Sequence, residues 1–160
     1  LLDCGCGGGA NLRKLLRKCP EGRVCGVDYS EISVQKSRKL NRKAIEAGLC
    51  EVLQASVTAL PFESARFDRV TAFETVYFWP ELKRSFREIF RVLKPGGMFL
   101  ICNECGGDHA GDEKWTRKID GMTIYKDVQL KAALEQAGFR AVQTHRSERG
   151  WLCITARRSG

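Results

Sequence analysis

A loop rich in glycine follows the first residues of the chain, where residues 3–9 read D-C-G-C-G-G-G. Glycine has no side chain and tolerates positive φ, so such a loop brings backbone N–H groups close to a ligand. Asp28 follows about 20 residues later, at the end of the next predicted strand, where a carboxylate faces the ribose hydroxyls of a nucleotide. The loop and Asp28 indicate a site for a nucleotide-like cofactor, although the loop alone could also be a structural turn.

Three consecutive aromatic residues, Tyr77, Phe78 and Trp79, follow another predicted strand shortly after Glu74. Aromatic side chains form the walls of small-molecule sites and attract cationic ligands through their ring faces. The alternative is that one or two of the rings pack against the following helix. Glu74 is a candidate base or polar anchor, and otherwise a capping or solvated carboxylate.

Further polar candidates follow the fifth predicted strand. Asn103 and Glu104 end that strand and are expected to face the same cleft. His109 is a candidate base in a glycine-rich segment, where the alternative is an ordinary surface histidine. Cys102 and Cys105 have C-x-x-C spacing, but no second matched pair supplies two more ligands, so no metal site is expected.

Composition describes an ordinary globular domain. The chain has 160 residues, a net charge of +8 and a charged share of 29%, which fits one domain with its own core. No run of about 18 apolar residues is present, so no membrane span is predicted. No export signal is visible, and the eight cysteines are expected to be reduced thiols in the cytoplasm. Because the chain starts at Leu1 and enters the glycine loop at once, we expect a preceding segment.

Strand and helix patterns alternate along the chain, as in an α/β protein. The patterns predict strands at 1–3, 23–28, 50–55, 67–73, 98–103, 140–147 and 151–157, and helices at 10–19, 30–48, 80–93 and 127–137. Ser30 is a predicted N-cap, Pro80 suits the first turn of its helix, and 94–97 is a predicted turn. The fold class is a doubly wound, mostly parallel, seven-stranded sheet with a C-terminal antiparallel hairpin.

Six motifs then occur in a fixed order along nearly the whole chain. They are D-x-G-x-G-x-G at Asp3, Gly5, Gly7 and Gly9, V-D-Y-S at 27–30, A-S-V-T-A-L-P-F at 55–62, F-D-R-V at 67–70, R-V-L-K-P-G-G at 91–97, and A-G-F at 137–139. This set resembles class I S-adenosylmethionine (SAM)-dependent methyltransferases, most closely the type-11 branch. The resemblance implies a Rossmann-like fold and SAM as the cofactor, with S-adenosylhomocysteine as the product.

The resemblance also implies roles for residues at matching positions. Asp3, Gly5, Gly7 and Gly9 would hold the methionine part of SAM, and Asp28 would accept from both ribose hydroxyls. The adenine would lie along Tyr29 and meet Ser56 and Val57, while Phe73 would lie beside the reacting methyl group. The family often has Asp where this chain has Ser56, so the adenine contact here lacks a charge.

The expected activity is in-line transfer of a methyl group to a small-molecule acceptor, bound by Tyr77, Phe78, Trp79, Asn103 and Glu104. One domain is expected over 1–160, with 104–125 as an inserted cap over the substrate. An RNA methyltransferase and a non-catalytic SAM-binding domain remain alternatives. The basic run at 36–43 lacks interleaved aromatic residues and is interpreted as a solvated helix face, which favours a small molecule over nucleic acid.

Overall fold

Seven strands form a single mixed sheet within the described part of the chain, which comprises residues 1–107 and 111–160 of this computed structural model. The strands are β1 (Leu2–Cys4), β2 (Val24–Asp28), β3 (Cys50–Gln54), β4 (Phe67–Phe73), β5 (Leu93–Asn103), β6 (Phe139–Arg146) and β7 (Leu152–Arg158). Their order is β3-β2-β1-β4-β5-β7-β6. Strands β1 to β5 pair in parallel, and β7 is antiparallel to both neighbours, which confirms the predicted fold class.

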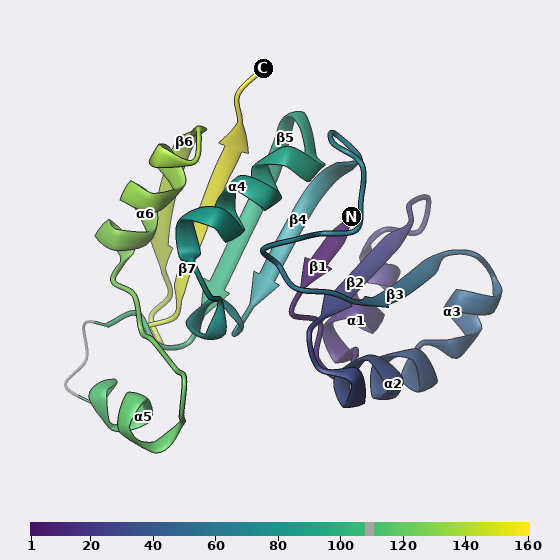
Figure 1. The fold of residues 1–160 in the computed structure, drawn as a ribbon, viewed down its shortest axis with the longest axis horizontal. Helices are drawn as coiled ribbons and strands as arrows, with labels where there is room; N and C mark the ends of the chain where they lie inside the picture. The colour runs from purple at the N-terminus through teal and green to yellow at the C-terminus, as the bar shows by residue number, and fades with distance from the viewer. Residues whose placement is uncertain (108–110) are drawn as a thin grey trace.

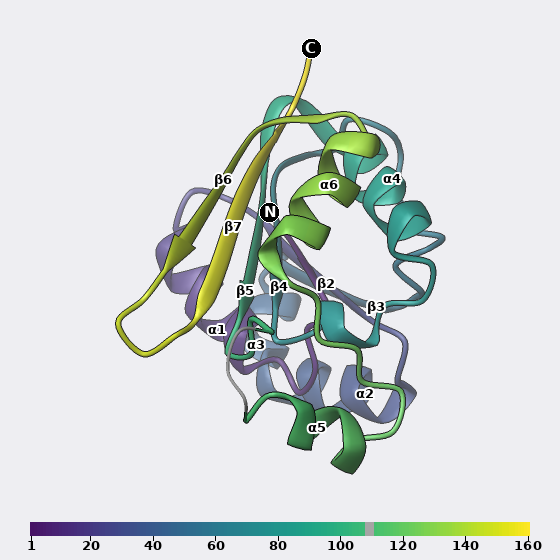
Figure 2. The same cartoon turned by 90° about the vertical axis from the view of Figure 1, so that its left-hand side faces the viewer.

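Helices cover both sides of the sheet (Figure 1). They are α1 (Ala10–Lys18), α2 (Glu31–Leu40), α3 (Arg42–Glu46), α4 (Leu82–Val92), α5 (Glu113–Lys118) and α6 (Asp127–Gln136), with a 3₁₀ turn, η1 (Val76–Phe78). Figure 2 shows α4 and α6 on one side of the sheet and α1 on the other. Within the described residues, no helix is long and apolar enough to cross a membrane.

The main core lies between the sheet and α4, where the apolar residues Leu82, Phe86, Ile89 and Phe90 recur at the spacing of one helix face. Phe86 and Ile89 of α4 are fully buried. The Phe86 ring meets Phe99 of β5 edge-on, with centroids 5.8 Å apart, and Trp79 stacks on Phe99 at 6.2 Å. The aromatic cluster thus fixes the end of β4 against α4, because Trp79 lies in the segment that joins them.

The predicted helix over 30–48 is divided in two at Asn41, which is a correction to the expected single helix. Ser30 does cap α2, since its hydroxyl accepts from Ser33 N at 3.3 Å. The Asn41 amide Nδ2 donates to Ser37 O at 3.0 Å and to Gly9 O at 3.1 Å. Side-chain bonds to the backbone compete with helix continuation, and here they tie the helix end to the glycine loop.

Two local predictions on either side of α4 were also wrong. The helix begins at Leu82 rather than Pro80, because Glu81 adopts a left-handed conformation with φ 46°. Residues 94–97 lie within the bounds of β5, where pairing with β4 passes from Leu93 directly to Met98. The expected turn is therefore an irregular stretch within β5, and regular pairing with β4 resumes at Met98, where the strand was predicted to begin.

Candidate active site

A cleft of about 710 Å³ opens where the parallel strands end. Its lining comes from the loops after β1, β2, β3 and β4 and from the segment after α5. This is the edge at which ligands bind in open α/β sheets. A smaller cavity of about 310 Å³ lies where the strands begin and includes none of the predicted site residues.

Asp28 lies at the end of β2 on the wall of this cleft and is 9% exposed. Its Oδ2 accepts from Gly7 N at 2.9 Å, and its Oδ1 accepts from Ser30 N at 2.9 Å. A carboxylate has about four lone-pair sites, so each oxygen retains the capacity to accept one more hydrogen bond. The glycine loop therefore orients the Asp28 carboxylate and leaves it able to accept from a pair of hydroxyl groups.

The glycines of the loop differ in their contacts. Gly5 lines the cleft with φ 78°, and a Cβ there would lie 1.9 Å from Thr75 Oγ1. Gly9 packs against α2, since a Cβ there would lie 2.4 Å from Ser37 Oγ. Gly7 N holds Asp28, and the N–H groups of Gly5 and Gly9 donate to backbone carbonyls. Neither Gly7 nor Gly9 is among the residues that line the cleft; Gly7 N contacts Asp28, and Gly9 packs against α2.

Asp3 lies behind the glycine loop and is nearly inaccessible to solvent. Its Oδ1 accepts from the Thr71 hydroxyl of β4 at 2.7 Å. Burial raises the pKa of Asp3 to about 7, and the negative charge of Asp28 acts in the same direction. This carboxyl therefore changes charge near neutral pH, within the framework that supports the cleft.

The residues expected around an adenine ring follow the adjacent strands β2 and β3. Tyr29, Ser56 and Val57 all line the cleft. Tyr29 is 76% exposed, so its ring is accessible along its length. The Ser56 hydroxyl lies 2.8 Å from the Thr58 hydroxyl, which orients it.

Glu74 follows β4 and lines the cleft in a left-handed conformation, with φ 57°. Its backbone N donates to Cys102 O at 3.0 Å, and its carboxylate Oε1 accepts from Glu104 N. Burial raises the pKa of Glu74, and the nearby charge of Glu104 adds to this, against the hydrogen bond from the Glu104 backbone. The carboxyl is held where it could accept a proton from a ligand.

The three consecutive aromatic residues separate into different environments. Phe78, 42% exposed, and Trp79 line the cleft. Trp79 also packs edge-on against Phe86 of α4, and its Nε1 donates to Thr75 Oγ1 at 3.2 Å. Tyr77 is buried outside the cleft lining, where its hydroxyl accepts from Cys105 N at 2.8 Å. Both interpretations of these rings, as cleft wall and as packing, therefore have support.

The other predicted residues lie around the cleft. Phe73 ends β4 half-buried opposite Cys102, and Glu104 is exposed, both outside the cleft lining. Asn103 is fully buried, and within the described residues neither polar atom of its amide has a hydrogen-bond partner. His109 lies outside the described residues.

Sequence reasoning missed part of the lining. Thr75, Pro80, Ser33, Asp120 and Gly121 also border the cleft. The Asp120-Gly121 dipeptide is a turn signal that could have placed a bend in the 104–125 segment. No group of three or more His, Cys, Asp or Glu side chains among the described residues is arranged to hold a metal ion.

Comparisons with known proteins show the family of this chain. Residues 2–101 match the methyltransferase domain family, type 11. Cycloartenol-C-24-methyltransferase 1 of Oryza sativa subsp. japonica is 35% identical over 89% of this chain, which covers 44% of that protein. Cycloartenol-C-24-methyltransferase of Arabidopsis thaliana is 32% identical over 89% of the chain, which covers 45% of it. The chain spans less than half the length of these relatives.

Solved structures share the fold. One is from the complex between the Haloferax volcanii Trm112 methyltransferase activator and the putative methyltransferase, with a TM-score of 0.90, 23% identity, and 99% of this chain and 81% of that chain covered. Another is geranyl diphosphate C-methyltransferase from Streptomyces coelicolor A3(2), with a TM-score of 0.82, 16% identity, and coverage of 98% and 70%. The family match over residues 2–101 is decisive: the chain belongs to the type-11 methyltransferase domains of the class I SAM-dependent methyltransferases.

Proposed function

We propose that this chain binds SAM in the cleft and transfers its methyl group to an apolar small molecule. The observation that carries the proposal is the Asp28 carboxylate, held at the cleft wall by Gly7 N and Ser30 N. Two further acceptor positions on that carboxylate match the two ribose hydroxyls of the cofactor. A cleft of about 710 Å³ also has the size of a site for a small molecule.

The cofactor would extend along the strand ends from Asp28 toward Glu74. Tyr29, Ser56 and Val57 are positioned for the adenine, and Gly5 for the methionine part. SAM supplies a methyl group that is already activated on a sulfonium, so the protein mainly aligns the reactants and excludes water. The exposed face of Phe78 favours a sulfonium cation next to an apolar acceptor.

The segment 104–125 is proposed to cover the acceptor. Tyr77 fastens the segment near both ends, since its hydroxyl bonds to Cys105 and its carbonyl accepts from Thr123 N at 2.8 Å. Asp120 and Gly121 of the same segment line the cleft. A cover anchored in this way would exclude water while the acceptor is bound.

Glu74 is proposed to act at the acceptor end of the cleft. Its raised pKa makes the carboxylate a better proton acceptor than a glutamate with the ordinary pKa, should the acceptor lose a proton during transfer. The fully buried Asn103 amide, at the end of the neighbouring strand β5, is a candidate partner for a polar group of the acceptor. His109 remains a candidate base. The relatives named for cycloartenol methylation suggest the class of acceptor.

Titration calorimetry with S-adenosylhomocysteine tests the cofactor site. Asp28→Asn keeps one side-chain oxygen as an acceptor but removes the charge, and we expect affinity to fall by about 100-fold, as for two lost charge-assisted hydrogen bonds. Asp68→Asn is the matched control, because Asp68 is exposed at the opposite end of the sheet and pairs with Lys94. Circular dichroism checks that each variant is folded. Equal affinity in wild type and Asp28→Asn would refute the site.

A methyl-transfer assay tests the acceptor class. The chain is incubated with methyl-labelled SAM and cycloartenol, and the label is followed into the organic phase. Transfer that Glu74→Gln slows without loss of cofactor affinity would support the acceptor site. Tight cofactor binding without transfer to cycloartenol or to other apolar alcohols would favour a non-catalytic SAM-binding domain. We also propose a cytoplasmic location, which fits the eight free cysteines.

A further inference from the structure

The positive charge of this protein is concentrated on helices α1 to α3. Helix α1 and residues 36–43 contain nine of the 27 Lys and Arg residues and none of the 19 carboxylates. The remaining 18 cations face 19 carboxylates, so the rest of the chain is close to neutral. A field with this asymmetry attracts anions to the face that these helices form.

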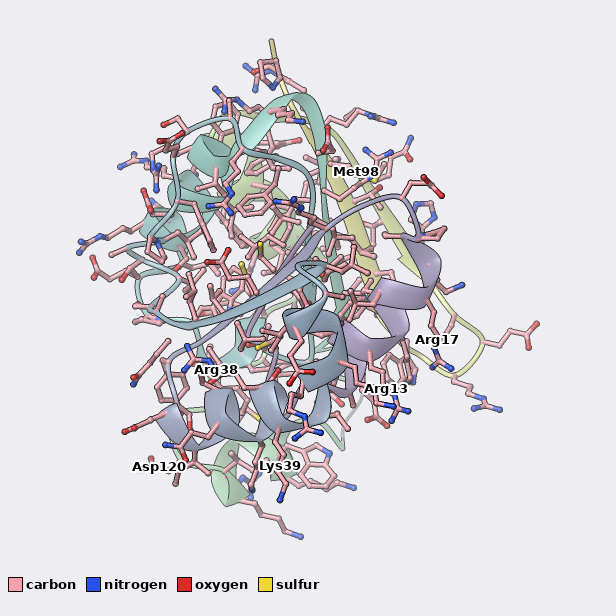
Figure 3. All side chains as sticks on the ribbon, turned by 90° about the vertical axis from the view of Figure 1, so that its right-hand side faces the viewer. Arg13, Arg17, Arg38, Lys39, Met98 and Asp120 are labelled. Atoms are coloured by element: carbon pink, nitrogen blue, oxygen red, sulfur yellow. The ribbon has the colours of Figure 1, made fainter. Side chains whose placement is uncertain are left out.

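Five of these cations border one cavity of about 620 Å³ between α1 and the junction of α2 with α3. This basic groove is lined by Arg13, Arg17, Lys39, Arg42 and Lys43. Figure 3 shows Arg13 and Arg17 on α1 and Lys39 on the neighbouring α2. The groove needs both helices, which is why residues 36–43 alone resemble a solvated helix face.

Carboxylates hardly neutralise the basic groove. Among the described residues, Arg42 alone of its five cations has a carboxylate within 4 Å, in an exposed pair with Glu46 at 3.6 Å. Arg13 and Arg17 lie four residues apart on one helix, where like charges repel. Arg38 differs, because its guanidinium donates to Val52 O at 2.7 and 3.0 Å and thereby serves the fold. A bound anion would relieve the repulsion within the groove.

The chemistry of the lining indicates the class of anion. One guanidinium group can donate two parallel hydrogen bonds to a phosphate, and each lysine adds a point charge. The remaining lining consists of Leu16, Leu40, Ala44 and Asn41, without an aromatic ring on which a base could stack. We propose that the basic groove binds a ligand that carries two or more phosphate groups next to a short apolar part. The groove shares no lining residue with the cleft, so this is a second site.

Such phosphates could come from a soluble oligophosphate or from the headgroups of anionic lipids. The first arm of the test is calorimetric titration with inorganic tripolyphosphate. The second is co-sedimentation with phosphatidylcholine vesicles, with and without phosphatidylglycerol. Arg17→Gln/Lys39→Gln should weaken binding about tenfold or more in the arm that binds. The matched control is Lys83→Gln/Arg87→Gln, which removes the same charge from exposed positions on α4.

Binding of tripolyphosphate that only the groove variant loses supports a soluble ligand, and binding confined to vesicles with phosphatidylglycerol supports a lipid headgroup. Equal losses in the two double variants would show a response to net charge alone and overturn the proposal. Failure of both probes would also overturn it, and binding of duplex RNA in their place would identify a surface for nucleic acid. All of the substituted side chains are exposed, so the variants should fold, which thermal unfolding checks.

Discussion

Replacing Asp3 by Asn should change how the stability of this protein depends on pH. Burial raises the pKa of Asp3 to about 7 in the folded protein, whereas an unfolded Asp titrates near 3.9. Between these values the folded state keeps a proton that the unfolded state has lost. The free energy of unfolding therefore falls as pH rises through this range, because the folded state binds more protons.

The magnitude follows from the width of the window. From pH 5 to the folded pKa near 7 is two pH units, and each unit is worth about 1.4 kcal/mol, so wild type loses about 3 kcal/mol between pH 5 and pH 8 through this group. Asn cannot titrate, and its amide oxygen can still accept from the Thr71 hydroxyl. Asp3→Asn should therefore gain about 3 kcal/mol relative to wild type over the same range.

The assay is urea unfolding at pH 5, 6, 7 and 8, followed by tryptophan fluorescence, for wild type and Asp3→Asn. Other titrating groups cancel in the difference between the two proteins. Asp68→Asn serves as control: the Lys94 hydrogen bond lowers the pKa of Asp68, so its contribution is lost only as pH falls below about 4. A difference that stays flat from pH 5 to pH 8 would refute the argument, since Asp3 would then be ionised throughout.

Three further changes have expected outcomes. Gly5→Ala should lower the free energy of unfolding, measured in urea, by about 3 kcal/mol, because Gly5 has a left-handed conformation and the new Cβ would lie 1.9 Å from a threonine hydroxyl. Gly8→Ala is the control and should be almost neutral, because the nearest atom to its Cβ would be 4.0 Å away. Tyr77→Phe should speed amide hydrogen exchange across the segment that its hydroxyl anchors; unchanged exchange would show that this bond does not hold the cover. Asn103→Leu should raise stability by about 1–3 kcal/mol, since it removes unpaired buried polar atoms, and should slow methyl transfer; a fall in stability would show that the amide has a structural partner.

Periodicity located most of the fold from the sequence because it reports which residues face a core. Strand β4 lies at Phe67–Phe73, as predicted, and Phe86 and Ile89 are buried as their spacing requires. The division at Asn41 could not be predicted in this way. The Asn41 amide bonds to Gly9 O, 32 residues away, and no local pattern contains such a contact.

The positions of some site residues could also be predicted from the sequence. Spacing placed Asp28 at the end of a strand, and the structure has it on the cleft wall. Spacing could not show that Gly7 N would bind the Asp28 carboxylate or that Gly9 would pack against α2, because equivalent glycines in a loop look alike until the loop is packed. The anchoring of Cys105 by the Tyr77 hydroxyl was likewise invisible, since it depends on how two loops meet at the ends of adjacent strands.

Strand β1 lies in the interior of the sheet between β2 and β4. Its register with β4 pairs Leu2 with Val70 and Asp3 with Thr71, so one of its edges stays unpaired until β4, which begins at Phe67, has been synthesised. An apolar strand with an open edge readily pairs with other chains. Nascent or truncated forms that end before β4 should therefore be the species most prone to aggregate, and closure of the sheet at β1 and β4 should be a slow step in folding.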